Sequence, residues 1–111
     1  MSSKTSANPP DFGPPGTDEY GPYHGRYVEL VPEGDVLVIL AAQVEQLLAL
    51  FRGVSDEDAS RPQSPYLWSL KEAVGHVIDT ERVFAYRALR FARKDPTPLP
   101  SFDQDDYVAN A

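Results

Sequence analysis

Apolar residues recur at helical spacing in two stretches of the chain. The first stretch predicts a helix over residues 35–52, on which large apolar side chains lie three, four or seven positions apart. These side chains are Leu37, Leu40, Val44, Leu47, Leu48 and Phe51. Asp35 can cap the start of this helix, and Gly53 is placed to end it in a left-handed conformation. Other apolar residues widen the face, so we expect the helix to be covered on more than one side.

The second stretch predicts a longer helix over about residues 70–94. Ser69 and Glu72 match the S-x-x-E pattern of a capping box, and Trp68 stands just before them as a candidate hydrophobic staple. At about 100° per residue, the helix gathers one broad apolar face. That face consists of Leu70, Ala73, Val74, Val77, Phe84, Ala88, Phe91 and Ala92. The opposite side carries Asp79, Tyr86, Arg90 and Arg93.

The segments outside these helices are rich in proline, glycine and polar residues. Residues 1–17 predict a disordered tail, and residues 18–33 predict an extended arm whose apolar side chains lie across a folded body. Residues 55–65 predict a short helical turn followed by a loop. Three alternating prolines stop the second helix, so we expect residues 95–111 to form an extended or short helical tail. The fold class that follows is all-α.

Composition narrows the class of protein. Of the 111 residues, 17 are acidic and 10 are Lys or Arg, and the net charge of −7 disfavours general attraction to nucleic-acid backbones. The lack of cysteine excludes disulfides, thiolate zinc sites and a cysteine nucleophile. The N-terminus has no apolar signal-peptide core, and no apolar run approaches the roughly 20 residues that cross a bilayer. We therefore expect one soluble cytoplasmic domain that binds neither nucleic acid nor membrane.

His76 is the residue with the clearest potential for chemistry. It lies at the edge of the apolar face of the second helix, with Glu72 and Thr80 one turn away and Asp79 three residues on. A neutral imidazole there is a candidate ligand for a divalent metal, and a neighbouring carboxylate can orient the other ring nitrogen. The alternative is a partly buried histidine that hydrogen-bonds to a helix neighbour. Spacing alone favours that alternative, because a metal site needs three or four protein ligands.

Glu81 stands almost at the centre of the apolar face, where an unpaired charge is costly to bury. One interpretation makes it, like Asp79, a cleft carboxylate that supports the metal ligand or acts as a general base. The other interpretation pairs it with an arginine such as Arg26 or Arg52, or with a backbone amide. The sequence favours this second, structural role.

The remaining charged groups favour surface roles. A scattered set of basic side chains on the second helix predicts a solvated face rather than a phosphate site. This set is Arg82, Arg87, Arg90, Arg93 and Lys94. Three acids near the C-terminus lack the glycine and the terminal glutamate of a calcium loop. These acids are Asp103, Asp105 and Asp106. His24 has no second ligand nearby in sequence, so we expect it at the surface.

Residues 68–93, WSLKEAVGHVIDTERVFAYRALRFAR, resemble the DinB-like (YfiT-like) proteins. The likeness extends over most of the chain after residue 17, through DEYGPY at 18–23, VPEGD at 31–35 and PLPSFDQDDY at 98–107. The resemblance implies an antiparallel four-helix bundle, commonly dimeric, whose cleft holds a zinc or nickel ion on three histidines. It also implies metal-dependent hydrolase or thiol-transferase activity on a small-molecule substrate.

Under this resemblance His76 matches the first histidine ligand. The other two ligands form an H-x-x-x-H pair on the last helix of the family, and none of the 111 residues matches them. We therefore expect the N-terminal half of such a domain, truncated to the first two long helices and the arm and inactive in isolation. The remaining ligands would come from a missing C-terminal half or from a second copy in a homodimer. The alternative is a non-catalytic helical module that dimerises or docks on another protein.

Overall fold

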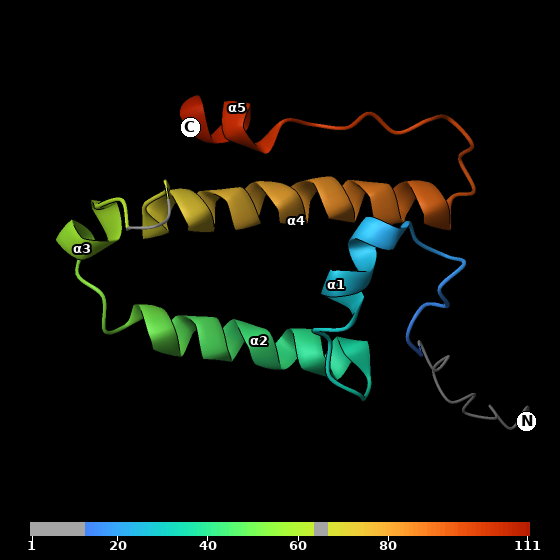
Figure 1. Ribbon diagram of the computed structural model, residues 1–111, viewed down its shortest axis with the longest axis horizontal. Helices are drawn as coiled ribbons and strands as arrows, with labels where there is room; N and C mark the ends of the chain where they lie inside the picture. The colour runs from blue at the N-terminus through green and yellow to red at the C-terminus, as the bar shows by residue number, and fades with distance from the viewer. Residues whose placement is uncertain (1–12, 64–66) are drawn as a thin grey trace, which may run out of the picture. The chain divides into compact units, whose positions relative to one another are not determined.

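The computed structural model describes residues 13–63 and 67–111, and the regular elements in this part of the chain are helices (Figure 1). The predicted all-α class is confirmed, whereas the antiparallel four-helix arrangement stays a prediction. The chain divides into two compact units, which we call the N-terminal unit, residues 1–53, and the C-terminal unit, residues 54–111. The expected disorder of residues 1–17 falls mostly on residues 1–12, which lie outside the described residues. No helix of the described residues is sufficiently long and apolar to span a bilayer.

The N-terminal unit begins with two short helical elements, η1 (Pro22–His24) and α1 (Gly25–Val28). The expectation of an extended arm over residues 18–33 is therefore wrong for its middle part. Proline fits the first turn of a helix because its φ is already helical and it has no N–H to leave unpaired. The turn then brings Tyr23 and Tyr27 together at i and i+4, with their hydroxyl oxygens 3.2 Å apart. This contact stabilises the helical turns η1 and α1, which the pattern of apolar residues does not predict.

Helix α2 (Val36–Phe51) agrees with the predicted helix to within one residue at each end. The Asp35 carboxylate caps it by accepting a hydrogen bond from the Leu37 backbone N–H at 2.8 Å. Gly34 precedes the cap at φ 131°, a conformation that disfavours any residue with a Cβ. The predicted left-handed stop at Gly53 is wrong, because the described residues with positive φ are Gly34 and Lys94. Helix α2 ends instead through Arg52, which keeps right-handed helical angles.

The C-terminal unit contains α3 (Asp56–Ser60), α4 (Leu70–Ala92) and α5 (Gln104–Ala109). Helix α3 confirms the predicted short helical turn, and part of the loop expected after it, residues 64–66, lies outside the described residues. A bridge between Pro62 and Ser69 and an ion pair between Lys71 and Asp56, 3.7 Å apart, hold α3 at the start of α4. The predicted capping box is confirmed, because Ser69 Oγ accepts from the Glu72 N–H and the Glu72 carboxylate accepts from the Ser69 N–H.

Helix α4 ends two residues before the predicted position, at a left-handed turn centred on Lys94 with φ 52°. The Lys94 N–H donates to the Phe91 carbonyl and the Asp95 N–H to the Arg90 carbonyl, which is the hydrogen-bond pattern of a Schellman cap. The chain then turns back, and α5 lies beside α4 (Figure 1). This reversal places the C-terminal segment along the helix that carries His76.

Burial within the described residues is slight. No apolar side chain among them is buried, and Ser69 is the one buried residue, 3% exposed. The predicted apolar face of α4 is open, since Val77, Phe84 and Phe91 are all exposed. The returning C-terminal segment instead covers another side of α4, where Arg90 has a side chain only 13% exposed. The expected solvated face is therefore wrong for Arg90, because the turn after α4 folds over it.

Candidate functional site

His76 lies on α4, six residues after the helix starts, and is half-buried. Its ring packs against Trp68 with 5.2 Å between ring centroids and 51° between the ring planes. Trp68 immediately precedes the N-cap Ser69, so the capping box fixes the backbone that carries the indole. The residue predicted as a staple therefore positions the imidazole. The half-buried state agrees with both interpretations of His76, and its role as a metal ligand stays a prediction.

The polar groups nearest to His76 on α4 have distinct surroundings. Glu72 is engaged in the capping box. Asp79 lies 3.8 Å from Arg82 in an i, i+3 ion pair, so the charge it faces in the structure is that of Arg82. The Thr80 hydroxyl, one turn after His76, is buried and has no hydrogen-bond partner within the described part of the chain. The support of His76 by Asp79 stays a prediction.

Glu81 is exposed, although it lies on the predicted apolar face. The face around it is open to solvent, so its carboxylate carries no large desolvation cost and needs no partner on that ground. Arg26, one of the two arginines considered as its partner, lies over the ring of Tyr23 with 4.4 Å between its guanidinium carbon and the ring centroid. The proposed roles of Glu81 beside a metal or in an ion pair both stay predictions.

The described residues do not complete a metal site by themselves. They contain no cluster of three or more His, Cys, Asp or Glu side chains placed to hold one ion. Around His76 they bring together one imidazole, one indole and one unpartnered hydroxyl. A stable zinc or nickel site needs more donors than this.

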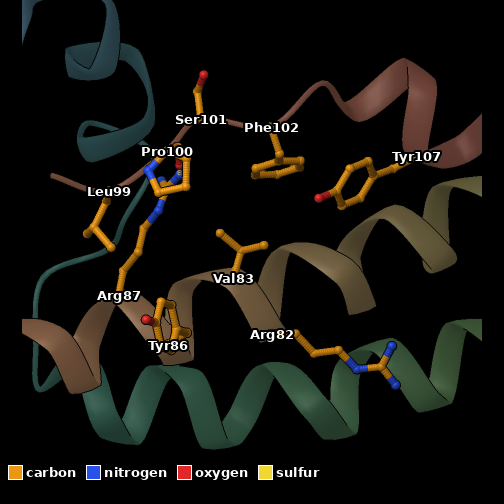
Figure 2. A pocket seen from close by; sticks show the side chains of 9 residues that line it. All are labelled: Arg82, Val83, Tyr86, Arg87, Leu99, Pro100, Ser101, Phe102 and Tyr107. Carbon is orange, nitrogen blue, oxygen red and sulfur yellow. Dashed lines mark hydrogen bonds between the residues drawn. The ribbon is translucent and has the colours of Figure 1, made fainter.

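A hollow of about 300 Å³ lies between α4 and the returning C-terminal segment (Figure 2). Helix α4 contributes Arg82, Val83, Tyr86 and Arg87 to its lining. The C-terminal segment contributes Leu99, Pro100, Ser101, Phe102 and Tyr107. The two walls are joined by a hydrogen bond of 3.0 Å from the Arg87 guanidinium to the Pro100 carbonyl. The hollow is thus a feature of the C-terminal unit alone.

This hollow is not predicted from the sequence, although the sequence contains a pattern that is consistent with it. The sequence places Arg87 on a solvated face, yet in the structure it is half-buried and donates a hydrogen bond to the C-terminal segment. Three alternating prolines keep residues 95–100 extended, and Phe102 and Tyr107 then provide aromatic surface that faces α4 (Figure 2). Proline alternation followed by aromatic residues is therefore the pattern that indicated a returning segment.

The other charged candidates have structural explanations. The Asp103 carboxylate accepts hydrogen bonds of 3.0 Å from the N–H groups of Asp105 and Asp106, so it caps α5. His24 is exposed and stands edge-on to Tyr23, with 5.4 Å between ring centroids. These observations confirm the expectation of surface roles for the C-terminal acids and for His24.

Comparison with known proteins gives one family. The family model described as DinB superfamily matches residues 39–111, a segment that runs from within α2 through α4 to the end of α5. No curated protein and no solved structure shows significant similarity to the chain. The matched segment includes both His76 and every residue that lines the hollow.

Proposed function

Because this chain belongs to the DinB superfamily, we propose that His76 is a ligand of a divalent metal, zinc or nickel, in a hydrolase or thiol transferase. The proposed activity is inferred from the family resemblance of residues 68–93. The half-buried position of His76 on α4 supports its assignment as a metal ligand. The other ligands come from outside the described residues, either from further polypeptide or from a second copy of the chain. The enzymatic activity belongs to that completed assembly.

The carrying observation is the contact between His76 and Trp68. A ring held against an indole at 5.2 Å loses less rotational freedom when it binds a metal than a free surface histidine does. The Thr80 hydroxyl, one turn after His76 on the same helix, is buried without a hydrogen-bond partner among the described residues, so it has hydrogen-bonding capacity for a group that they do not supply. The chain's own contribution is thus to hold one imidazole in a fixed orientation.

Trp68 provides the test, since it is the one tryptophan of the chain and lies next to His76. Ni²⁺ quenches tryptophan fluorescence at short range, so a Ni²⁺ titration of the full chain should quench Trp68. Zn²⁺ should compete and restore the signal. His76→Ala should abolish the Ni²⁺ response, while His24→Ala, which removes the other histidine of the chain, should keep it.

Two results would reject the metal proposal. One is a Ni²⁺ response that survives His76→Ala in a variant with unchanged helical circular dichroism. The other is Trp68 fluorescence of the wild-type chain that does not change at millimolar Ni²⁺, the range in which even a single imidazole binds this ion. Either result leaves His76 as a residue that packs on Trp68.

The second candidate function is a helical module that forms a homodimer, and the exposed apolar surface of α2 supports it. Val38 and Leu50 are 65% and 69% exposed, and Glu45 is the one charged residue of this helix. Apolar surface of this extent marks an interface, and a second copy of α2 offers a matching surface about a twofold axis.

Sedimentation equilibrium of the full chain tests this second candidate. We expect a dimer that Val44→Glu dissociates, because the substitution places a charge in the middle of α2. Gln43→Glu adds the same charge one position away and should have a smaller effect, because Gln43 is already polar. A monodisperse monomer at micromolar concentration would overturn the homodimer. A dimer whose His76 binds no metal would favour the module over the enzyme.

A further inference from the structure

The hollow beside α4 has the size and the walls of a small-ligand site. Its volume of about 300 Å³ falls at the lower end of the range for such sites. Val83 lies at its base on α4, and the rings of Phe102 and Tyr107 face this base from the C-terminal segment (Figure 2). The two rings are 5.2 Å apart between centroids and tilted by 43°. A compact ring or branched apolar group placed there contacts all three side chains.

The charges around the hollow favour an anion. Arg87 donates one of the five N–H groups of its guanidinium to the Pro100 carbonyl, and the other four are not used in this bond. Arg82, also in the lining, pairs with Asp79 at 3.8 Å and points its guanidinium away from the two rings (Figure 2), so Arg87 is the cation available to the hollow. None of the lining residues is acidic, and the Tyr107 hydroxyl is turned toward the hollow (Figure 2). The Arg87 guanidinium and the Tyr107 hydroxyl are therefore donors available to a negative group in the hollow.

We propose that this hollow binds a small monocarboxylic acid with a compact aromatic or branched apolar body. The carboxylate accepts the free N–H groups of Arg87, whose planar fork matches a carboxylate. The apolar body packs between Val83 and the rings of Phe102 and Tyr107. A neutral molecule of the same shape keeps the apolar contacts and loses the charge-assisted hydrogen bonds, so it binds more weakly.

This site is separate from the one proposed at His76. Val83 follows His76 by seven residues, which is two helical turns or about 10 Å along α4. His76 is not part of the lining. Ligand binding in the hollow is therefore independent of metal binding at His76, and it is tested in the absence of metal.

Nuclear magnetic resonance of the full ¹⁵N-labelled chain tests the proposal with two matched probes, benzoate and its neutral analogue benzamide. Both probes have the same ring and nearly the same shape. We expect benzoate to shift the amide signals of α4 around Val83 and of residues 99–107 saturably. Benzamide should shift the same signals with an affinity about tenfold lower, which corresponds to about 1.4 kcal/mol.

Three variants separate charge, shape and general attraction. Arg87→Gln should weaken benzoate about tenfold and benzamide less, since the charge-assisted hydrogen bonds form with the carboxylate alone. Benzamide binding that persists in this variant also demonstrates that the hollow is still formed, and a benzamide loss as large as the benzoate loss contradicts the role of charge. Val83→Trp fills the hollow and should abolish binding of both probes. Arg93→Gln removes an exposed positive charge at the C-cap of α4, outside the lining, and should leave both affinities unchanged.

Each opposing result overturns the proposal. A specific site should bind benzoate with a Kd below about 10 mM. If benzoate causes no shifts at this concentration, the proposed site is rejected. Equal affinity for benzoate and benzamide would show that the carboxylate contributes nothing to binding, which contradicts the proposed acid site. Equal loss of benzoate binding in Arg87→Gln and Arg93→Gln, or binding that survives Val83→Trp, shows general attraction to a basic helix instead of a site.

Discussion

Arg90 and Asp95 form an ion pair across the turn that ends α4, with 2.7 Å between Arg90 Nε and an oxygen of the Asp95 carboxylate. The same guanidinium donates to the Thr97 carbonyl at 2.6 Å and to the Tyr86 hydroxyl at 3.2 Å. Asp95 in turn accepts a hydrogen bond of 3.0 Å from the Thr97 N–H. Arg90 therefore attaches the proline-rich segment to α4 and helps to shape the hollow that follows.

The Asp95 carboxyl should make the C-terminal unit sensitive to acid. Hydrogen bonds from Thr97, and then the charge of Arg90, hold the pKa of Asp95 below its usual range. A carboxyl with a lowered folded pKa stabilises the fold above its unfolded pKa of about 3.9, and this contribution is lost as pH falls through the folded value. Urea unfolding followed by circular dichroism should therefore show a stability loss between about pH 5 and pH 2 that is smaller in Asp95→Asn than in wild type.

Glu57→Gln is the matched control for this prediction. Glu57 is 85% exposed and lies 3.7 Å from Arg61, a surface pair of the kind that contributes little to stability. The variant should lose stability over the same pH range by the same amount as wild type. If Asp95→Asn and Glu57→Gln have identical acid profiles, the Asp95 carboxyl contributes nothing specific to the cap of α4.

Lys94→Gly should stabilise the chain by about 1 kcal/mol, because a left-handed conformation is strained for lysine and free of strain for glycine. Lys94 has φ 52°, whereas its neighbour Arg93 has φ −94°. Arg93→Gly therefore relieves no strain and should destabilise the chain through the added freedom of the unfolded state. Thermal unfolding of the two variants measures whether each substitution raises or lowers the stability of the chain. A destabilising Lys94→Gly would mean that the lysine side chain makes a contact worth more than the strain.

The helix starts were predictable from sequence because each cap acts within three residues. Asp35 and the pair Ser69 and Glu72 are local patterns whose partners are backbone groups of the same turn. The end of α4 was less predictable. Its left-handed position falls on Lys94 rather than on a glycine, and the ion pair between Arg90 and Asp95 then supports the turn.

The candidate site was predictable only as far as it lies on one helix. A helical wheel places His76 on α4 but includes no residue that precedes the helix. Trp68 is such a residue, and it contacts the His76 ring because of the geometry of the capped helix start. The same wheel assigns Arg87 to solvent because it omits the segment that returns 13 residues later to accept its hydrogen bond at Pro100. Contacts across such a reversal depend on the path of the tail, which periodicity does not specify.

Tyr23→Phe should lower the pKa of Tyr27. The hydrogen bond with Tyr23 raises the pKa of the Tyr27 phenol above 10.0, because it favours the neutral form. A group with a raised folded pKa stabilises the fold below its unfolded pKa, and this contribution is lost as pH rises through the folded value. Nuclear magnetic resonance titration of ¹³C-labelled tyrosine should resolve the shift of Tyr27. Tyr86→Phe, which removes a phenol from the C-terminal unit, should leave that titration unchanged.

Ser69→Ala should destabilise α4 by about 1 kcal/mol, because it leaves the Glu72 N–H without its acceptor at the one buried residue of the described chain. Glu72→Gln should cost less, since glutamine can also fill the last position of a capping box. The indole is attached to this cap, so Ser69→Ala should also loosen the packing of Trp68 on His76 and change the Trp68 fluorescence. Urea unfolding and emission spectra of the two variants measure these effects. Stability unchanged in Ser69→Ala would show that the capping box does not hold the start of α4, and the orientation of His76 would then need another cause.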